Sequence, residues 1–250
     1  MISKEISSLQ HPLVKHWVRL RTSASYRLRE NALLITGENI LSELANAHTF
    51  NYLIIQKGTP LPRSIPCKEI CVVSEEILKK ITGLVQPGPM AAELPLPPLS
   101  DLRHCERILV IDQVNDPGNL GTLIRSALAF GWDGAFLLEG SADPFNDKAL
   151  RASKGAVFRL KLARGDEHAL AALIATKKWT VYGADMAGRA VEENFSYPPP
   201  FMLILGNEAQ GLSASSRQNS SLLSLPMPGA MESLNVAVAG SIFMFLLRKR

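Results

Sequence analysis

Residues 107–138 read RILVIDQVNDPGNLGTLIRSALAFGWDGAFLL and contain the pattern that decides the fold. The segment 107–112, with its apolar run 108–111, predicts a buried strand, 119–130 predicts a helix, and 134–138 predicts a second buried strand. Apolar strands that alternate with helices are typical of a parallel sheet covered on both faces. The sequence therefore predicts an α/β fold.

The alternation of strand and helix continues to the C-terminal end of the sequence, and a less regular pattern precedes it. The further strands that we expect are 51–55, 70–73, 158–162, 179–183 and 201–205. The further helices that we expect are 11–30, 39–47, 75–81, 144–153, 168–177 and 234–247.

A proline-rich segment separates these two patterns. Five of the 16 prolines lie between Pro87 and Pro98, so we expect the segment 87–106 to be a linker. The sequence predicts two domains, a small α/β domain over 1–98 and a larger α/β domain over 105–250.

Composition indicates a folded, non-secreted protein. Of the 250 residues, 46% are hydrophobic and 20% are charged, and the net charge of +4 mildly favours an anionic partner. The three cysteines, Cys67, Cys71 and Cys105, do not form a zinc-like or disulfide pattern, which favours a reducing cytoplasm. The N-terminus has no apolar signal core, and the 14-residue apolar run 234–247 is too short for a membrane span. We expect no membrane attachment.

The loop in the segment 111–131 is the first candidate site. Ligands of parallel sheets bind beyond the carboxyl ends of the strands. Gly118 and Gly121 would allow a close approach to the backbone, and the helix N-terminus would favour an anion. Asn119 and Arg125 are six residues apart, so whether they share a helix face depends on where the helix begins. The alternative is a capping turn with a solvated arginine.

A dinucleotide site is a further alternative for this loop. The loop has a G-x-x-G spacing and lacks the full G-x-G-x-x-G pattern. Glu139, at the end of the next strand, would occupy the place of a ribose-binding acid.

Two more polar loops follow apolar strands. The segment 203–213, LILGNEAQGLS, places Glu208 in a loop bounded by glycines, where an ordinary exposed turn is the alternative. The segment 225–247, LPMPGAMESLNVAVAGSIFMFLL, places Ser233 and Asn235 at the start of an apolar helix. Ser233 can cap that helix, but Asn235 needs a polar partner.

The three loops together resemble the signature motifs of a known family. DPGNLGTLIRSA (116–127), LGNEAQGLS (205–213) and LPMPGAMESLNVAVA (225–239) are similar to those of the SpoU (TrmH) family of RNA ribose 2′-O-methyltransferases, in the SPOUT superfamily. SADPFNDKALRASKGAVFRL (141–160) resembles the middle segment of the same family, and the resemblance covers about 107–250.

The first 100 residues resemble the small RNA substrate-binding domain of many family members. ISSLQHPLVKHWVRL (6–20) and LLITGENILSE (33–43) carry this resemblance. Thr36 departs from the pattern, because family members commonly have an acidic residue there.

The resemblance implies a parallel-sheet SPOUT fold with a C-terminal trefoil knot, which binds S-adenosylmethionine and needs no metal. It implies that the cofactor is lined by Leu205, Gly206, Leu225, Met227 and Leu234. It implies that the catalytic set is Arg125, Asn119, Glu208, Ser233 and Asn235.

Within that set the resemblance makes Arg125 the catalytic residue. Because arginine keeps its proton well above neutral pH, we favour an orienting and charge-stabilising role over that of a base. Asn119 would position either the ribose or Arg125, and Glu208 would fix the loop around them.

Basic segments suggest where RNA would bind. Residues 148–164 include six Lys or Arg and no acid, and a basic helix covers 15–29. The RNA-binding residues that we expect are Lys148, Arg151, Lys154, Arg19 and Arg27.

The function predicted from the sequence is a homodimeric, cytoplasmic RNA 2′-O-methyltransferase that acts on structured rRNA or tRNA, with rRNA the favoured substrate. One alternative is an inactive RNA-binding or ribosome-assembly protein with the same fold. The other is a nucleotide-dependent oxidoreductase.

Overall fold

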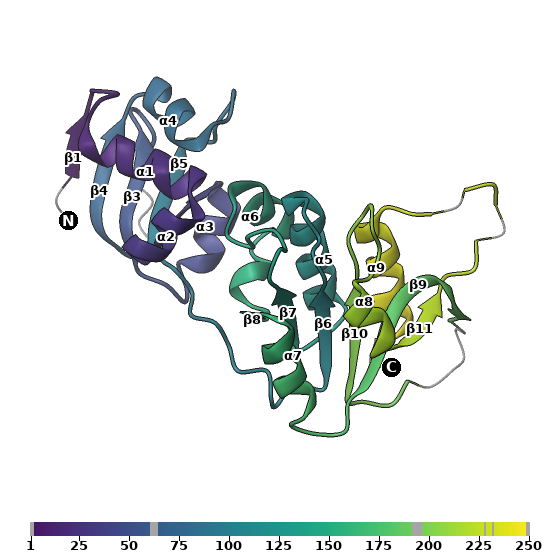
Figure 1. Ribbon diagram of the computed structural model, residues 1–250. Helices are drawn as coiled ribbons and strands as arrows, with labels where there is room; N and C mark the ends of the chain where they lie inside the picture. The colour runs from purple at the N-terminus through teal and green to yellow at the C-terminus, as the bar shows by residue number, and fades with distance from the viewer. Residues whose placement is uncertain (1–2, 61–64, 192–196, 228, 232, 249–250) are drawn as a thin grey trace. The chain divides into compact units, whose positions relative to one another are not determined.

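The computed structural model describes residues 3–60, 65–191, 197–227, 229–231 and 233–248. The chain forms two compact units, each with its own β-sheet (Figure 1). The first contains Met1–Pro97 together with Phe145–Arg151, and the second contains Pro98–Pro144 together with Ala152–Arg250. Within the described residues, no helix is both long enough and apolar enough to cross a membrane.

The first unit contains a mixed sheet with strand order β1-β4-β3-β5-β2. Its strands are β1 (Ser3–Ile6), β2 (Ala32–Thr36), β3 (Phe50–Gln56), β4 (Cys67–Val73) and β5 (Met90–Pro95). Its helices are α1 (Pro12–Thr22), α2 (Ala24–Glu30), α3 (Glu38–Leu44) and α4 (Glu75–Thr82). Strands β1, β4 and β3 are parallel, and β5 runs antiparallel to both β3 and β2.

Two predictions for the first unit are wrong. The helix expected over 11–30 is interrupted at Ser23, which ends α1 and whose hydroxyl accepts a hydrogen bond from the Tyr26 amide at the start of α2. Residues 90–95, expected in the linker, form strand β5 between β3 and β2. Its buried segment Met90–Leu94 is flanked rather than interrupted by prolines, so the ladder is preserved.

The second unit contains a six-stranded, entirely parallel sheet with strand order β11-β9-β10-β6-β7-β8. Its strands are β6 (Arg107–Ile111), β7 (Gly134–Leu138), β8 (Lys161–Gly165), β9 (Thr180–Ala190), β10 (Phe201–Leu205) and β11 (Ser221–Ser224). Its helices are α5 (Pro117–Ala129), α7 (Glu167–Ile174), α8 (Ala214–Gln218) and α9 (Val236–Leu246). Helix α6 (Asp147–Ser153) and the 3₁₀ turn Ala156–Phe158 also follow β7 in the chain. The predicted parallel α/β fold is confirmed.

Helix caps explain where the two helices of the predicted site begin. α5 starts at Pro117, two residues earlier than expected, because the Asp116 carboxylate accepts a hydrogen bond from the Asn119 amide. α9 starts at Val236, because Asn235 is its N-cap and accepts from the Ala237 and Val238 amides. Ser233 therefore precedes the helix instead of capping it.

The strand order brings two loops together. From β6 the chain proceeds to β7 and β8 on one side, whereas β10 pairs with β6 on the other side. The loops that follow β6 and β10 are therefore neighbours at the point where the order reverses, which is the usual ligand site of such sheets. The Asp112 amide donates to the Leu205 carbonyl at 2.8 Å, and the Asp112 carboxylate accepts from the Ser213 amide at 2.8 Å.

Helix α9 packs closely on the sheet and on α5. A methyl group at Gly240 would lie 2.4 Å from Leu205 Cδ1 and 2.5 Å from Leu123 Cδ2, so the glycine permits this approach. The Ser126 and Ser241 hydroxyls are hydrogen-bonded at 2.8 Å between the two helices. These contacts fix α5 and α9 relative to each other.

Candidate active site

Three of the predicted catalytic residues form one hydrogen-bonded chain. Asn119 Nδ2 donates to Glu208 Oε1 at 3.0 Å, and Asn235 Nδ2 donates to Asn119 Oδ1 at 3.2 Å. The three side chains come from α5, from the loop after β10 and from the N-cap of α9. Both functional atoms of the Asn119 amide are used, which fixes its orientation.

Glu208 also ties its loop to the loop before α5. Its carboxylate oxygens accept from the backbone amides of Asn115 at 3.4 Å and Asp116 at 3.5 Å. Partial burial acts to raise the pKa of Glu208, but the hydrogen bonds from Asn119 and from backbone amides outweigh it and lower the pKa below 4.5. Glu208 is therefore a carboxylate at neutral pH, and it acts as an acceptor.

The neighbouring residue Asn207 strengthens the same connection. Its Nδ2 donates to the Gln113 carbonyl at 2.8 Å, and its backbone exchanges two hydrogen bonds of 2.9 Å with Gly211. A side chain at Gly206 would lie 2.3 Å from the Gly211 carbonyl carbon, so only glycine fits there. The loop Asn207–Gly211 is thus held closed, with Glu208 at its exposed edge.

Arg125 is exposed and does not join this chain. It lies six residues beyond Asn119 on α5, which corresponds to about 240° of rotation around the helix. The two side chains therefore lie on different faces of α5. Within the described part of the chain, the Arg125 guanidinium has no hydrogen-bond or ion-pair partner.

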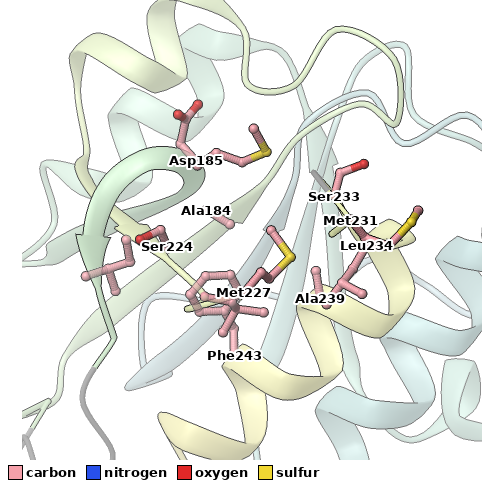
Figure 2. A pocket seen from close by; sticks show the side chains of 12 residues that line it. Ala184, Asp185, Ser224, Met227, Met231, Ser233, Leu234, Ala239 and Phe243 are labelled. Atoms are coloured by element: carbon pink, nitrogen blue, oxygen red, sulfur yellow. The ribbon is translucent and has the colours of Figure 1, made fainter. Parts of the chain in front are cut away.

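A cavity of about 540 Å³ lies beside the start of α9 (Figure 2). It is lined by Ala184, Asp185, Met186, Leu223, Ser224, Leu225, Met227, Met231, Ser233, Leu234, Ala239 and Phe243. Figure 2 shows Asp185 and Ala184 on one side of it, and Ser233, Met231 and Leu234 on the other. Apolar walls, a few polar groups and this volume suit a ligand of nucleoside size.

The predicted cofactor residues divide into two groups. Leu225, Met227 and Leu234 line the cavity, together with Ser233 from the predicted catalytic set. Leu205 and Gly206 are buried and are absent from its lining. They pack instead against Gly240 of α9 and against Gly211 of their own loop.

The two RNA-binding residues predicted in the first basic segment differ in their exposure to solvent. Arg19 is exposed, and its guanidinium lies 4.1 Å from the centre of the Tyr26 ring. The prediction that Arg27 contacts RNA is corrected, because Arg27 is only 3% exposed. Its guanidinium donates to the carbonyls of Leu20 at 2.6 Å and Arg21 at 3.2 Å, at the C-terminal end of α1.

The second basic segment is mostly accessible. Lys148 and Lys154 are exposed, and Lys154 has a positive φ of 49°. Arg151 forms an ion pair of 2.6 Å with Asp147, one turn earlier on α6. Among the described residues, no three His, Cys, Asp or Glu side chains come together as a metal site would require.

Sequence reasoning missed one wall of the cavity and two ties between the loops. Ala184–Met186 directly follow the strand expected over 179–183, and no periodic pattern marks them. Asn115 contacts Glu208 through its backbone amide, so its residue type gave no signal. Asn207 lies within the second motif, where its amide side chain in a glycine-bounded loop was an available signal.

Comparison with known proteins identifies the family. The family model described as the SpoU rRNA methylase family matches residues 106–245. The chain belongs to the SpoU rRNA methylase family. The 23S rRNA (guanosine(2553)-2′-O)-methyltransferase RlmP of Bacillus subtilis is 34% identical over 248 residues, which cover 98% of this chain and 99% of RlmP.

Solved structures of methyltransferases match this chain over almost its full length. An rRNA methyltransferase from Sinorhizobium meliloti, solved with AdoMet bound, matches with a TM-score of 0.85 and 26% identity, covering 98% of this chain and 97% of its own. The SpoU methyltransferase AviRb from Streptomyces viridochromogenes matches with a TM-score of 0.81 and 25% identity. The match covers 94% of this chain and 96% of the AviRb chain. Family membership favours a methyltransferase over the oxidoreductase alternative.

Proposed function

We propose that this protein transfers the methyl group of S-adenosylmethionine to a ribose 2′-hydroxyl of ribosomal RNA. The observation that carries the proposal is the Glu208–Asn119–Asn235 chain next to a cavity of about 540 Å³. The RlmP match over almost the full length of both chains makes 23S rRNA the first substrate to test. An intact polar chain also favours an active enzyme over an inactive RNA-binding relative.

The residues that line the cavity fit S-adenosylmethionine. Leu225, Met227 and Leu234 offer apolar surface for a flat ring, and Ser233 offers a hydroxyl near the start of α9. The cofactor supplies an already activated methyl group on a positively charged sulfur.

The remaining task is to align and stabilise the ribose oxygen. The Glu208 carboxylate holds Asn119 Nδ2, and the Asn235 amide holds Asn119 Oδ1, so the polar chain presents one fixed arrangement. We assign to Arg125 the stabilisation of negative charge that develops on the ribose oxygen. Its guanidinium is exposed on α5 and can donate hydrogen bonds to such an oxygen.

We further propose that the enzyme is a homodimer that pairs through α9. Val238, Ile242 and Phe245 are 49%, 39% and 45% exposed and recur at intervals of four and three residues. That spacing places them on one face of the helix, here named the α9 stripe. An exposed apolar stripe on a helix is suited to pairing with a second copy of itself.

Three further expectations complete the proposal. The segment 1–98 would be the RNA substrate-binding domain, and 105–250 the methyltransferase domain with a C-terminal trefoil knot. Lys148, Lys154 and Arg19 are exposed cations that would contact RNA phosphates. The enzyme would act in the cytoplasm, where ribosomal RNA is assembled.

Incubation with labelled S-adenosylmethionine tests the reaction. The RNA should be ribosomal RNA from a strain that lacks this methyltransferase, and the methylated riboses should be mapped by nucleotide. Label at one ribose of 23S rRNA would support the proposal. Cofactor binding without label on any RNA, whether free or in ribosomal subunits, would favour the inactive RNA-binding alternative.

A further inference from the structure

Strand β9 leaves the sheet for five residues beside the cofactor cavity. Gly183 pairs with Leu222 of β11, and the next ladder partner, Leu223, pairs with Arg189. Residues 184–188 are therefore looped out opposite two consecutive residues of β11, and we call them the β9 bulge. Such bulges redirect side chains and are frequent next to active sites.

The base of the β9 bulge is held against β11. A methyl group at Gly188 would lie 2.5 Å from the Leu222 carbonyl carbon and 2.6 Å from the Leu223 nitrogen, so no larger residue fits. The Ser224 hydroxyl donates to the Gly188 carbonyl at 2.9 Å. One end of the bulge is thus fixed by the sheet itself.

The outer part of the β9 bulge is held by an ion pair. Asp185 Oδ1 accepts from the Ala187 amide at 2.9 Å, which closes the turn within the bulge. Asp185 Oδ2 pairs with the Arg217 guanidinium of α8 in a close contact. The Asp185 side chain is 9% exposed and the Arg217 side chain is 48% exposed. The pair is therefore shielded on the side of the carboxylate.

The β9 bulge forms one wall of the cavity through Ala184, Asp185 and Met186, opposite Ser233 and Leu234 (Figure 2). Arg217 is not part of the lining, yet it binds the residue at the centre of this wall. We propose that the Asp185–Arg217 ion pair is a strut that holds the wall in place, which makes Arg217 a positioning residue for S-adenosylmethionine. This inference rests on the proposed function.

The physical basis is preorganisation of the cavity. Without Arg217, Asp185 keeps the hydrogen bond from the Ala187 amide but loses its contact with α8, so more of the position of the bulge must be fixed when the cofactor binds. That ordering lowers affinity, while contacts with the reacting atoms stay unchanged. The cofactor product, S-adenosylhomocysteine, shares everything except the methyl group and the positive charge, so the loss of affinity should be the same for both.

Arg217→Gln tests the strut. We expect the dissociation constants of S-adenosylmethionine and S-adenosylhomocysteine to rise together by about fivefold or more, as a coupling of about 1 kcal/mol predicts. The KM for S-adenosylmethionine should rise in proportion, with kcat at saturation unchanged. Arg217→Lys keeps the charge and should restore most of the affinity.

Arg103→Gln is the matched control. It breaks another Arg–Asp pair of the second unit, that with Asp101 at 2.7 Å, which lies outside the cavity lining. It should leave cofactor binding unchanged. Hydrogen exchange of the Ala187 amide supplies a local readout, since it should accelerate in Arg217→Gln without cofactor.

The outcomes distinguish the two proposals. Wild-type affinity in Arg217→Gln, or an equal loss in Arg103→Gln, would overturn the strut. A loss confined to S-adenosylmethionine would also overturn it, because it would indicate recognition of charge by Asp185. Failure of the wild-type protein to bind S-adenosylmethionine would instead overturn the proposed function, and the strut with it.

Discussion

Asn119 is the residue on which the polar contacts of the candidate site converge. Its backbone amide donates to the Asp116 carboxylate, its side-chain amide donates to Glu208, and its side-chain oxygen accepts from Asn235. Three loops that are far apart in the sequence therefore share one small side chain. An aspartate at the same position could not donate to Glu208, so shape alone does not satisfy this position.

Arg125 gives the sharpest prediction at the residue scale. Arg125→Ala should lower kcat by about 10²–10³, the usual effect of removing one group that stabilises developing charge. The dissociation constant of S-adenosylmethionine should remain near the wild-type value, because Arg125 is absent from the cavity lining. Single-turnover methylation and calorimetric titration measure the two quantities. Thr122→Ala changes another exposed residue of the same helix and is the control. Loss of cofactor binding in Arg125→Ala would contradict the role assigned to Arg125.

Glu208 predicts a pH dependence of stability. Its folded-state pKa is lowered, so the carboxylate stabilises the folded protein above its ordinary pKa of 4.5 and loses that effect as pH falls through the folded value. Glu208→Gln should therefore be less stable than wild type at neutral pH, and the difference should vanish in acid. Urea unfolding over a series of pH values from neutral into acid measures how the difference changes. A constant difference across this range would refute the assignment, and Glu106→Gln controls for the loss of an exposed carboxylate.

At the scale of elements, the starts of α5 and α9 define the site. Asp116 caps α5 and Asn235 caps α9, and Asn119 at the start of α5 bonds Asn235. Helix N-termini carry partial positive charge, so two of them side by side favour an electron-rich oxygen nearby.

Two substitutions of Asn235 separate its cap from its link to Asn119. Asn235→Ala loses both and should destabilise the protein by about 1 kcal/mol, the usual cost of a lost N-cap. Asn235→Asp keeps the acceptor for the Ala237 and Val238 amides but cannot donate to Asn119 Oδ1. We expect near-wild-type stability with strongly reduced methylation in Asn235→Asp. Chemical unfolding and the methylation assay, run on both variants, check this; full activity in Asn235→Asp would show that the cap alone matters.

Long apolar elements were predictable from the sequence, and short or irregular ones were not. Strands β6, β7 and β10 are buried, and all their residues except Arg107 are apolar, so residue type was enough to predict the parallel core. Strand β11 has four residues and helix α8 has five, too few to show a period. The β9 bulge was not predicted, because Gly188 is required by its contact with β11. Local sequence spacing does not encode such a tertiary contact.

The site was predictable in part for a related reason. Glu208, Asn119 and Asn235 were expected from motifs that resemble a family, and the structure brings them together. The burial of Arg27 was not predictable, because a basic residue in a basic helix gives no sign that carbonyls at the end of α1 will receive it. The separation of Arg125 from Asn119 became clear only once the start of α5 was known.

At the scale of the whole molecule, the α9 stripe predicts the oligomeric state. Ile242→Glu combined with Phe245→Glu places two charges on the stripe, so we expect the dimer to dissociate. Light scattering coupled to size exclusion measures the molecular mass. Val85→Glu changes an 85% exposed apolar residue of the first unit and should leave the dimer intact. A dimer that persists in the double variant would place the interface elsewhere.

The exposed lysines around α6 predict how RNA affinity depends on salt. Lys148→Glu combined with Lys154→Glu should weaken RNA binding and flatten the slope of log affinity against log salt by about 0.7 or more per lost phosphate contact. Filter binding over a range of potassium chloride concentrations gives the slope. Lys178→Glu reverses the charge of an exposed lysine outside the basic segment 148–164 and is the control. An unchanged slope in the double variant would move the RNA path to another surface.

The hydrogen bonds of Asn119 have a consequence for synthesis of the chain. Its partners Glu208 and Asn235 lie 89 and 116 residues later in the sequence. Contacts of such long range form late, because the intervening chain must be ordered first. While the protein is being translated, the Asn119 side chain cannot bond both of its partners until residue 235 has emerged from the exit tunnel. The proposed enzyme is therefore inert as a nascent chain until residue 235 is available, because the Glu208–Asn119–Asn235 chain is incomplete before then.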